Sequence, residues 1–197
     1  DLLFGGFLFY FFQTCSKMKP MREFFYSMWQ IVEIVIIAAA TVFLIRAFIV
    51  QPFLVSGSSM FSTYVDGDYV LVDELTYKFK EPSRGDVVVF RYPLKPSVFY
   101  IKRVVGLPGD HVVVKGGQVY INDKQVEETY LDKGITSNGD LDIVVKPGEL
   151  YAFGDNRPHS YDSRFFGPIP FDNLIGLVNL RLLPVERAEI MRRPIYN

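Results

Sequence analysis

The stretch Phe99-Tyr-Ile-Lys-Arg-Val-Val105 is typical of a β-strand and contains two adjacent cations. Successive side chains of a strand point to opposite faces, so Lys102 shares one face with Tyr100 and Val104, and Arg103 lies on the other. Because the two cations point in opposite directions, we expect one of them to face apolar surroundings. This strand is therefore both part of a sheet and a candidate for unusual chemistry.

Similar short patterns of period two surround this stretch on both sides. The further predicted strands are 68–73, 86–91, 111–115, 118–122, 149–153 and 174–183. Gly116-Gly117 separates two of them and predicts a tight hairpin. Residues 127–142 are polar and predict a loop or a peripheral hairpin. We expect residues 51–197 to form a mainly β domain of short antiparallel strands, without repeats.

Residues 28–50, MWQIVEIVIIAAATVFLIRAFIV, predict a transmembrane helix. About 20 helical residues cross a hydrocarbon core, and Glu33 and Arg46 stand near the two ends of the segment. A buried helix of a soluble protein is a weaker interpretation, because no second helix of this kind could cover it. A cleaved signal peptide is also disfavoured, because no small-x-small site follows.

Three cations, Lys17, Lys19 and Arg22, precede this helix. The positive-inside rule predicts that residues 1–27 are cytoplasmic or interfacial and that residues 51–197 lie outside the cytoplasm. Arg46 weakens the charge asymmetry. Residues 2–12 are apolar and could be part of another span or lie at the interface. The chain begins with Asp1 rather than Met, which leaves open whether the natural protein starts further upstream.

The composition excludes several other classes of protein. The formal net charge of −1 over 197 residues gives no electrostatic reason to expect a nucleic-acid partner. The only cysteine, Cys15, cannot form an intrachain disulfide and adjoins an aromatic run. Two histidines, His111 and His159, are too few for a histidine-built metal site. We therefore expect neither a metal nor a cofactor.

Three segments are poorly explained by packing: 56–60 (SGSSM), 101–110 (IKRVVGLPGD) and 154–167 (GDNRPHSYDSRFFG). A serine is a weak nucleophile until a base removes its proton, and burial lowers the pKa of a lysine so that its neutral amine can do this. Arginine stays charged and cannot serve. Taken singly, Ser59 predicts an ordinary loop, Lys102 a solvated lysine, and the third segment a structural turn.

In this order and after an apolar span, the segments together resemble the type I signal peptidase family over about residues 30–184. The family's Gly-x-Ser-Met-x-Pro-Thr is similar to Gly57-Ser-Ser-Met-Phe-Ser-Thr63, and its Gly-Asp to Gly67-Asp68. Its Arg-Gly-Asp is similar to 84–86, its Lys-Arg-Val-x-Gly-x-Pro-Gly-Asp to 102–110, and its Gly-Asp-Asn-Arg…Ser-x-Asp-Ser-Arg…Gly to 154–167.

The resemblance implies a signal-peptidase-like β domain and a membrane-bound serine endopeptidase. Ser59 would be the nucleophile and Lys102 the general base, acting through an acyl-enzyme. The backbone N–H of Ser59 would help hold the oxyanion. Gly57 would belong to the same oxyanion site; it stands where some relatives have a hydroxyl donor, so a backbone donor or another group would serve instead. Ser160 would orient Lys102. The supporting network would comprise Asp155, Asn156, Arg157, Asp162 and Arg164.

The resemblance also implies the substrate, a signal peptide on an exported preprotein, and places the enzyme near the secretion translocon at the bilayer. The cleavage segment would add as a strand between 53–56 and 99–101. Shallow pockets would accept the small side chains of Ala-x-Ala sites. The predicted contacts are Phe53, Val55, Ser56, Met60, Tyr100 and Ile101. Ser59 follows Val50 by only nine residues, so we expect it to lie close to the bilayer.

One departure from the family pattern is Ser62, which stands where the family has proline and predicts a less rigid turn. Two other functions stay open. One is a Ser-His-Asp hydrolase that uses His159 with Asp155 or Asp162. The other is a non-catalytic, membrane-tethered β domain that binds peptides.

Overall fold

The computed structural model describes the backbone of residues 3–48, 50–191 and 193–194, with the side chains of residues 21–43, 51–191 and 193–194. The chain divides into two compact units, Asp1–Ala47 and Phe48–Asn197.

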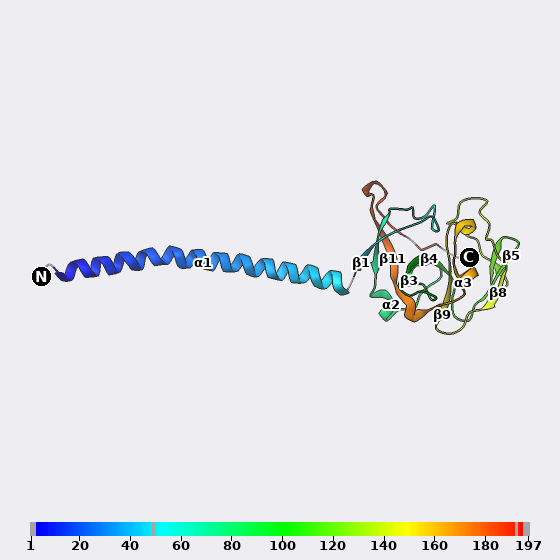
Figure 1. Cartoon of the computed structure of the whole chain (residues 1–197), viewed down its shortest axis with the longest axis horizontal. Helices are drawn as coiled ribbons and strands as arrows, with labels where there is room; N and C mark the ends of the chain where they lie inside the picture. The colour runs from blue at the N-terminus through cyan, green and yellow to red at the C-terminus, as the bar shows by residue number, and fades with distance from the viewer. Residues whose placement is uncertain (1–2, 49, 192, 195–197) are drawn as a thin grey trace. The chain divides into compact units, whose positions relative to one another are not determined.

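The first unit consists of one helix, α1 (Leu3–Phe48), drawn in blue in Figure 1. Its segment Met21–Phe43 is long and apolar enough to cross a membrane, by length and composition. The predicted helical segment 28–50 is wrong at its end, because Val50 already belongs to strand β1. Pro52 accounts for this boundary, since proline disfavours helical backbone in the residue before it. The helix also includes residues 3–27, for which no helix was predicted.

The second unit is mainly β, as predicted, and consists of two antiparallel sheets. The large sheet has the strand order β1-β2-β11-β3-β4-β9-β10, with β12 paired to β11. Its strands are β1 (Val50–Leu54), β2 (Tyr69–Asp73), β3 (Val87–Arg91), β4 (Phe99–Gly106), β9 (Glu149–Phe153), β10 (Ile169–Pro170), β11 (Leu174–Leu183) and β12 (Glu189–Ile190).

The small sheet has the order β7-β6-β5-β8. Its strands are β5 (His111–Lys115), β6 (Gln118–Ile121), β7 (Lys124–Gln125) and β8 (Leu141–Val144). The predicted Gly116-Gly117 hairpin is confirmed, with φ of 59° and 79° at the two glycines, values that favour glycine. Strand β8 begins inside the region predicted to be a loop. Short helices complete the unit: α2 (Thr76–Phe79), α3 (Ser163–Phe166), η1 (Arg157–His159), η2 (Phe171–Asn173) and η3 (Val185–Arg187).

Strand β3 is buried on both faces, and this creates two cores in the large sheet. Val87 and Val89 pack with Val55 and Met60 on one side. Val88 and Phe90 pack with other apolar residues, including Val104, on the other side. The continuous apolar run of β3 is thus explained by its place inside the sheet.

Two strand edges near the candidate site have no sheet partner among the described strands. Strand β1 pairs only with β2. Strand β4 pairs with β3 along Phe99–Arg103, but its other edge meets β9 only from Arg103 onward. The edge of β4 from Phe99 to Lys102 is therefore open, and so is the outer edge of β1.

Candidate active site

Ser59 lies in the turn that follows β1, and local backbone chemistry fixes this turn. Gly57 has φ +92°, a conformation that L side chains rarely adopt. The backbone N–H of Gly57 donates to Oδ1 of Asp66 at 2.7 Å. The Gly57 amide is thus already engaged, which argues against the predicted part of Gly57 in holding an oxyanion.

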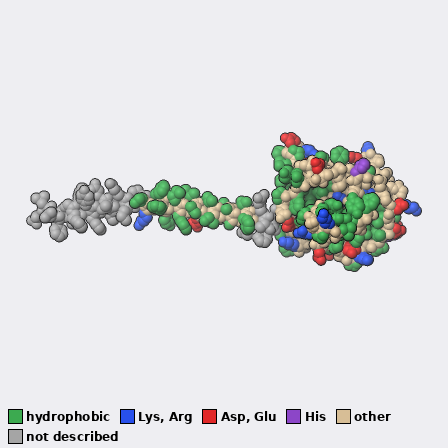
Figure 2. Space-filling view, viewed as in Figure 1, with side chains coloured by type: hydrophobic (Ala, Val, Ile, Leu, Met, Phe, Trp, Pro, Cys, Tyr) green, Lys and Arg blue, Asp and Glu red, His purple; other side chains and the backbone are tan. Residues whose placement is uncertain are grey.

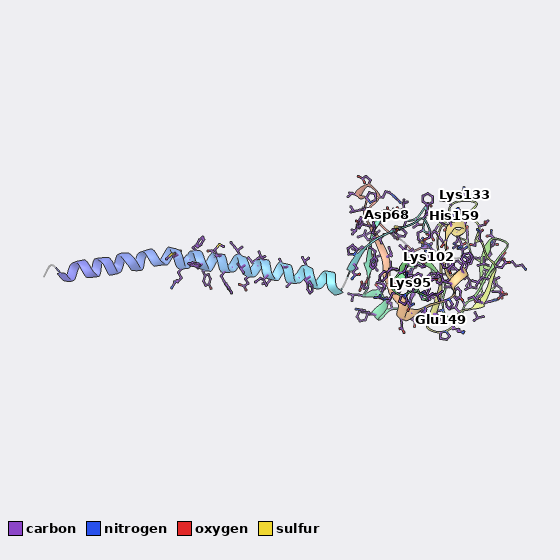
Figure 3. All side chains as sticks on the ribbon, in the orientation of Figure 1. Asp68, Lys95, Lys102, Lys133, Glu149 and His159 are labelled. Carbon is purple, nitrogen blue, oxygen red and sulfur yellow. The ribbon has the colours of Figure 1, made fainter. Side chains whose placement is uncertain are left out.

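Lys102 points from β4 toward this turn, and Figure 3 labels it within the β unit. Its Nζ lies 2.7 Å from Oγ of Ser59 and donates to the carbonyl of Ile101 at 2.9 Å. Only 3% of Lys102 is exposed. Among the described residues, no carboxylate lies within ion-pair distance of this amine.

The environment of Lys102 increases the share of its neutral form compared with a solvated lysine. Burial lowers the pKa of Lys102 to about 8, although the more distant Asp162 and Asp155 raise it in part. A neutral amine beside a serine hydroxyl can accept the hydroxyl proton.

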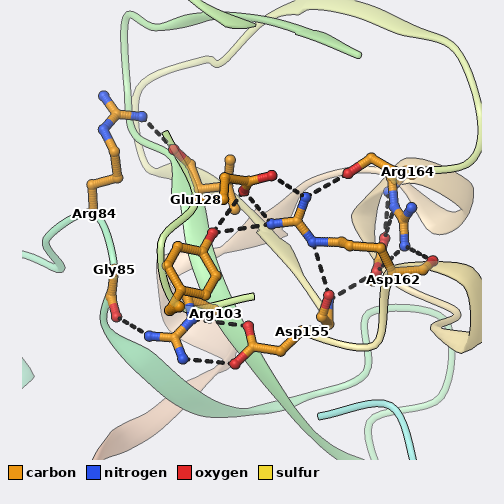
Figure 4. Close-up of polar contacts among 12 residues, drawn as sticks. Arg84, Gly85, Arg103, Glu128, Asp155, Asp162 and Arg164 are labelled. Atoms are coloured by element: carbon orange, nitrogen blue, oxygen red, sulfur yellow. Dashed lines mark hydrogen bonds and ion pairs between the residues drawn. The ribbon is translucent and has the colours of Figure 1, made fainter. Parts of the chain in front are cut away.

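Arg103 is also only 3% exposed. The sequence led us to expect one buried cation in this strand, whereas the structure buries both. Its guanidinium donates to both carboxylate oxygens of Asp155, at 2.9 Å and 2.6 Å, and to the carbonyl of Gly85 (Figure 4). This bidentate ion pair ties β4 to the segment that follows β9.

Asn156 connects this third segment to the nucleophile turn. Its side-chain amide donates to the carbonyl of Ser58 at 3.0 Å. Its backbone N–H donates to the carbonyl of Ser59 at 3.0 Å. The two bonds hold the two peptide groups that flank Ser59, Ser58–Ser59 and Ser59–Met60.

Buried ion pairs hold the rest of the segment (Figure 4). Arg164 donates to both oxygens of Asp162, at 2.8 Å and 2.7 Å, and Asp162 also accepts from the N–H of Gly154. Arg157 is 1% exposed and pairs with Glu128 of the polar region after β7. Glu128 was not predicted, because no periodicity marks it.

Ser160 is buried, but its Oγ has no hydrogen-bond partner among the described residues. The expected hydrogen bond from Ser160 to Lys102 is thus not formed. The hydroxyl instead stands over Gly154, where a Cβ would come within 2.2 Å of it and within 2.4 Å of the Ser59 carbonyl oxygen. Only glycine fits at position 154.

Two residues missed in the sequence hold the far side of the nucleophile turn. The hydroxyl of Thr63 donates to Oδ2 of Asp155 at 2.6 Å. Arg181 of β11 donates to the Thr63 carbonyl at 2.7 Å. Thr63 is thus held from both ends, which compensates for the flexibility expected from Ser62 in place of proline.

A cavity of about 280 Å³ opens beside Ser59 and Lys102. The predicted contacts Phe53, Val55, Ser56, Tyr100 and Ile101 line it, together with His159 and Tyr161. Met60 does not line this cavity. It is 1% exposed and packs beneath the turn, so its predicted contact with substrate is wrong. Figure 2 shows hydrophobic side chains gathered on the displayed face of this unit. The exposed apolar residues of the unit include Leu54, Leu94 and Phe99.

His159 lies on the rim of the cavity and is exposed (Figure 3). Within the described part of the chain, no hydrogen bond or ion pair joins its ring to Ser59, Asp155 or Asp162. Both carboxylates are instead occupied by arginines. The geometry therefore gives no support to a Ser-His-Asp arrangement.

Comparison with known proteins agrees with this geometry. The family model described as signal peptidase, peptidase S26, matches residues 28–183. The chain belongs to the signal peptidase family. This signal peptidase is 39% identical over 159 residues to signal peptidase I U of Bacillus subtilis (strain 168), covering 76% of this chain and 84% of the relative. It is 34% identical over 175 residues to signal peptidase IB of Staphylococcus aureus (strain MRSA252), covering 80% and 91%.

The signal peptidase also aligns with a crystal structure of a signal peptidase I from Enterococcus faecalis V583. The two share 30% sequence identity with a TM-score of 0.45, over 50% of this chain and 97% of the other. Membership of the family identifies the protein as a serine protease, a hydrolase that removes signal peptides.

Proposed function

We propose that Ser59 and Lys102 form a catalytic dyad that hydrolyses the peptide bond through an acyl-enzyme. One observation carries this proposal: Nζ of Lys102 lies 2.7 Å from Oγ of Ser59 in a buried site without a neighbouring carboxylate. Burial makes the charged amine costly, so the site raises the share of the base form above that of an ordinary lysine.

The reaction follows from this arrangement. The Lys102 amine takes the proton of the Ser59 hydroxyl while Oγ attacks the scissile carbonyl carbon, and the resulting ammonium gives that proton to the leaving amine as the C–N bond breaks. In the second half, the same amine takes a proton from water, which attacks the acyl ester. The ester C–O bond breaks, and the proton returns to Oγ of Ser59.

The carbonyl oxygen needs hydrogen-bond donors during both attacks. The backbone N–H of Ser59 serves as one donor in this proposal, because the N–H of Gly57 is engaged by Asp66. Asn156 keeps the Ser59 peptide oriented through the two carbonyls that it binds. The buried Ser160 hydroxyl, which has no hydrogen-bond partner in the described part of the chain, would orient the Lys102 ammonium in this proposal.

The substrate binds as an added strand in this proposal. The outer edge of β1 and the open edge of β4 both border the cavity and can pair with a peptide backbone between them. Val55 and Ile101 leave room for small side chains, which fits cleavage after Ala-x-Ala.

The proposed domain organisation follows the charge and hydropathy of the sequence. Residues 1–27 lie in the cytoplasm or at the interface, 28–50 contain the membrane anchor, and 51–197 form the catalytic domain outside the cytoplasm. The apolar segment Met21–Phe43 supports a membrane anchor. The enzyme then meets preproteins at the bilayer, in the vicinity of the translocon.

Cleavage of a preprotein in detergent by the wild type, Ser59→Ala, Lys102→Ala and His159→Ala tests the proposal. We expect cleavage by the wild type and His159→Ala only. Activity in Lys102→Ala together with its loss in His159→Ala would favour a histidine base. A wild type that binds the preprotein without shortening it would favour the non-catalytic peptide-binding domain.

A further inference from the structure

A second cavity of about 360 Å³ lies beyond the aromatic end of the first one. Phe53 and Phe99 line both cavities, and their rings meet edge to face with centroids 5.8 Å apart. The guanidinium of Arg91 lies 5.2 Å from the centre of the Phe99 ring and supports it from the side of the second cavity. The two cavities therefore share one aromatic wall.

We propose that this second cavity binds a large apolar side chain of the signal peptide, about five to seven residues before the cleaved bond. The proposal rests on the proposed function, because it uses the strand-like binding of the substrate between β1 and β4. It adds a recognition site beyond the small pockets beside Ser59.

The position along the peptide follows from strand geometry. In the proposed dyad Nζ of Lys102 lies 2.7 Å from Oγ of Ser59, so the residue before the cut would lie opposite Lys102. An added strand advances by about one residue for each residue of its neighbour. Phe99 then lies opposite about the fourth residue before the cut. The next three or so residues, at about 3.3 Å each, pass the shared aromatic wall and reach the second cavity.

The lining of the second cavity determines what it accepts. Its lining is mixed: Tyr77, Phe171 and Ile175 are half-buried and offer aromatic and aliphatic surface to a ligand, whereas Gln51 and Glu74 add polar groups. Charged groups such as Lys78 and Arg91 are exposed at its edge. An apolar side chain can bury its surface against the walls while the peptide backbone stays at the polar edge. The first cavity accepts small residues, so the enzyme would recognise a pattern in two parts.

Photocross-linking tests this placement directly. Full-length Ser59→Ala protein in detergent would be mixed with signal peptides that carry benzoylphenylalanine at one position, from the first to the eighth before the cut. We expect cross-links to Tyr77, Phe171 or Ile175 from the fifth to seventh positions and not from the first three. Cross-links from the fifth to seventh positions that all fall elsewhere would overturn the proposal.

Measurements of KM provide an independent test of the second cavity. Phe171→Ala is expected to raise KM about tenfold for a peptide with leucine at the sixth position before the cut, but not for a peptide that begins at the fourth. Phe79→Ala is the matched control, because Phe79 is 82% exposed and does not line either cavity. Equal KM changes for both peptides would refute the second cavity as a binding site.

The proposed function and the proposed second binding site can be refuted separately. If the wild type does not cleave the short peptide, the proposed function is at fault. If it cleaves the short peptide but the long peptide gains nothing from its apolar residue, only the second cavity is at fault. The cross-linking arm needs no substitution in the cavity, so it decides the matter even if Phe171→Ala fails to fold.

Discussion

Lowering the pH from about 9.5 to about 6.5 is expected to reduce kcat/KM for preprotein cleavage about thirtyfold, with a midpoint near pH 8. The reaction needs the neutral amine of Lys102, and burial lowers the pKa of this lysine to about 8. At pH 6.5, about 3% of such an amine is neutral. A lysine with the ordinary pKa of 10.5 would be neutral in only about one molecule in ten thousand.

The assay is initial-rate cleavage of a preprotein in detergent at substrate concentrations well below KM, from pH 6 to pH 10. A histidine base of ordinary pKa, about 6.5, would leave about half of the maximal rate at pH 6.5. The two bases thus differ roughly sixteenfold at this pH. His159→Asn should keep the midpoint near 8, and a midpoint near 6.5 in the wild type would refute the reasoning.

The same pKa shift predicts that the catalytic lysine destabilises the fold. Because the pKa of Lys102 is lower in the folded protein, the unfolded chain binds more protons between about pH 8 and 10.5, and this group adds stability as the pH rises through that window. Below pH 8 the contribution is lost. Lys102→Met should therefore unfold with a free energy about 3 kcal/mol higher than the wild type at pH 7, an advantage that shrinks toward pH 10.5. Urea unfolding at the two pH values measures it, and an equal or lower stability of Lys102→Met at pH 7 would contradict the reasoning.

Three further substitutions test the surroundings of the dyad. Gly154→Ala should lower kcat by about a hundredfold, because the alanine Cβ would lie 2.4 Å from the Ser59 carbonyl oxygen and displace the nucleophile turn. A kcat near that of the wild type would contradict this reasoning. Asp155→Ala should lower the free energy of unfolding by about 3–5 kcal/mol, because it leaves the buried Arg103 without its carboxylate. Urea unfolding measures this loss, and a much smaller loss would contradict the reasoning. Thr63→Val should lower the free energy of unfolding by about 1–3 kcal/mol, because it removes the hydroxyl that donates to the Asp155 carboxylate. Thr63→Ser keeps the hydroxyl and should cost less. Equal losses in the two variants would argue against that hydrogen bond.

The sheet could be predicted where short apolar or alternating runs are bounded by turn residues. Strands β9 and β11 coincide with the predicted ranges 149–153 and 174–183, because their patterns depend only on local sequence. Only the first residue of β1, Val50, was assigned to the apolar helix, since a run of hydrophobic residues does not distinguish a helix from a strand. Strand β8 lies partly in a polar region, and its pairing with β5 decides its structure.

The candidate site divides in the same way. Ser59 and Lys102 stand in recognisable motifs, and the structure brings them within hydrogen-bond distance. The burial of Arg103 could not be predicted, because it depends on Asp155, which is 52 residues away in the sequence. The roles of Thr63, Arg181 and Glu128 are likewise set by partners that only the fold brings near. Met60 was assigned to the substrate for its place in a motif, but it fills the core beneath the turn.

The open edges of β1 and β4 have a consequence for inhibitor design. Backbone amides are common to every peptide, so a ligand held by these edges gains most of its affinity from groups that do not depend on its sequence. A compound that keeps the extended backbone and varies only its side chains should therefore tolerate wide chemical change. Methylation of a single amide nitrogen, in contrast, should weaken it at each position between the two edges, because successive amides of an extended chain face β1 and β4 in turn.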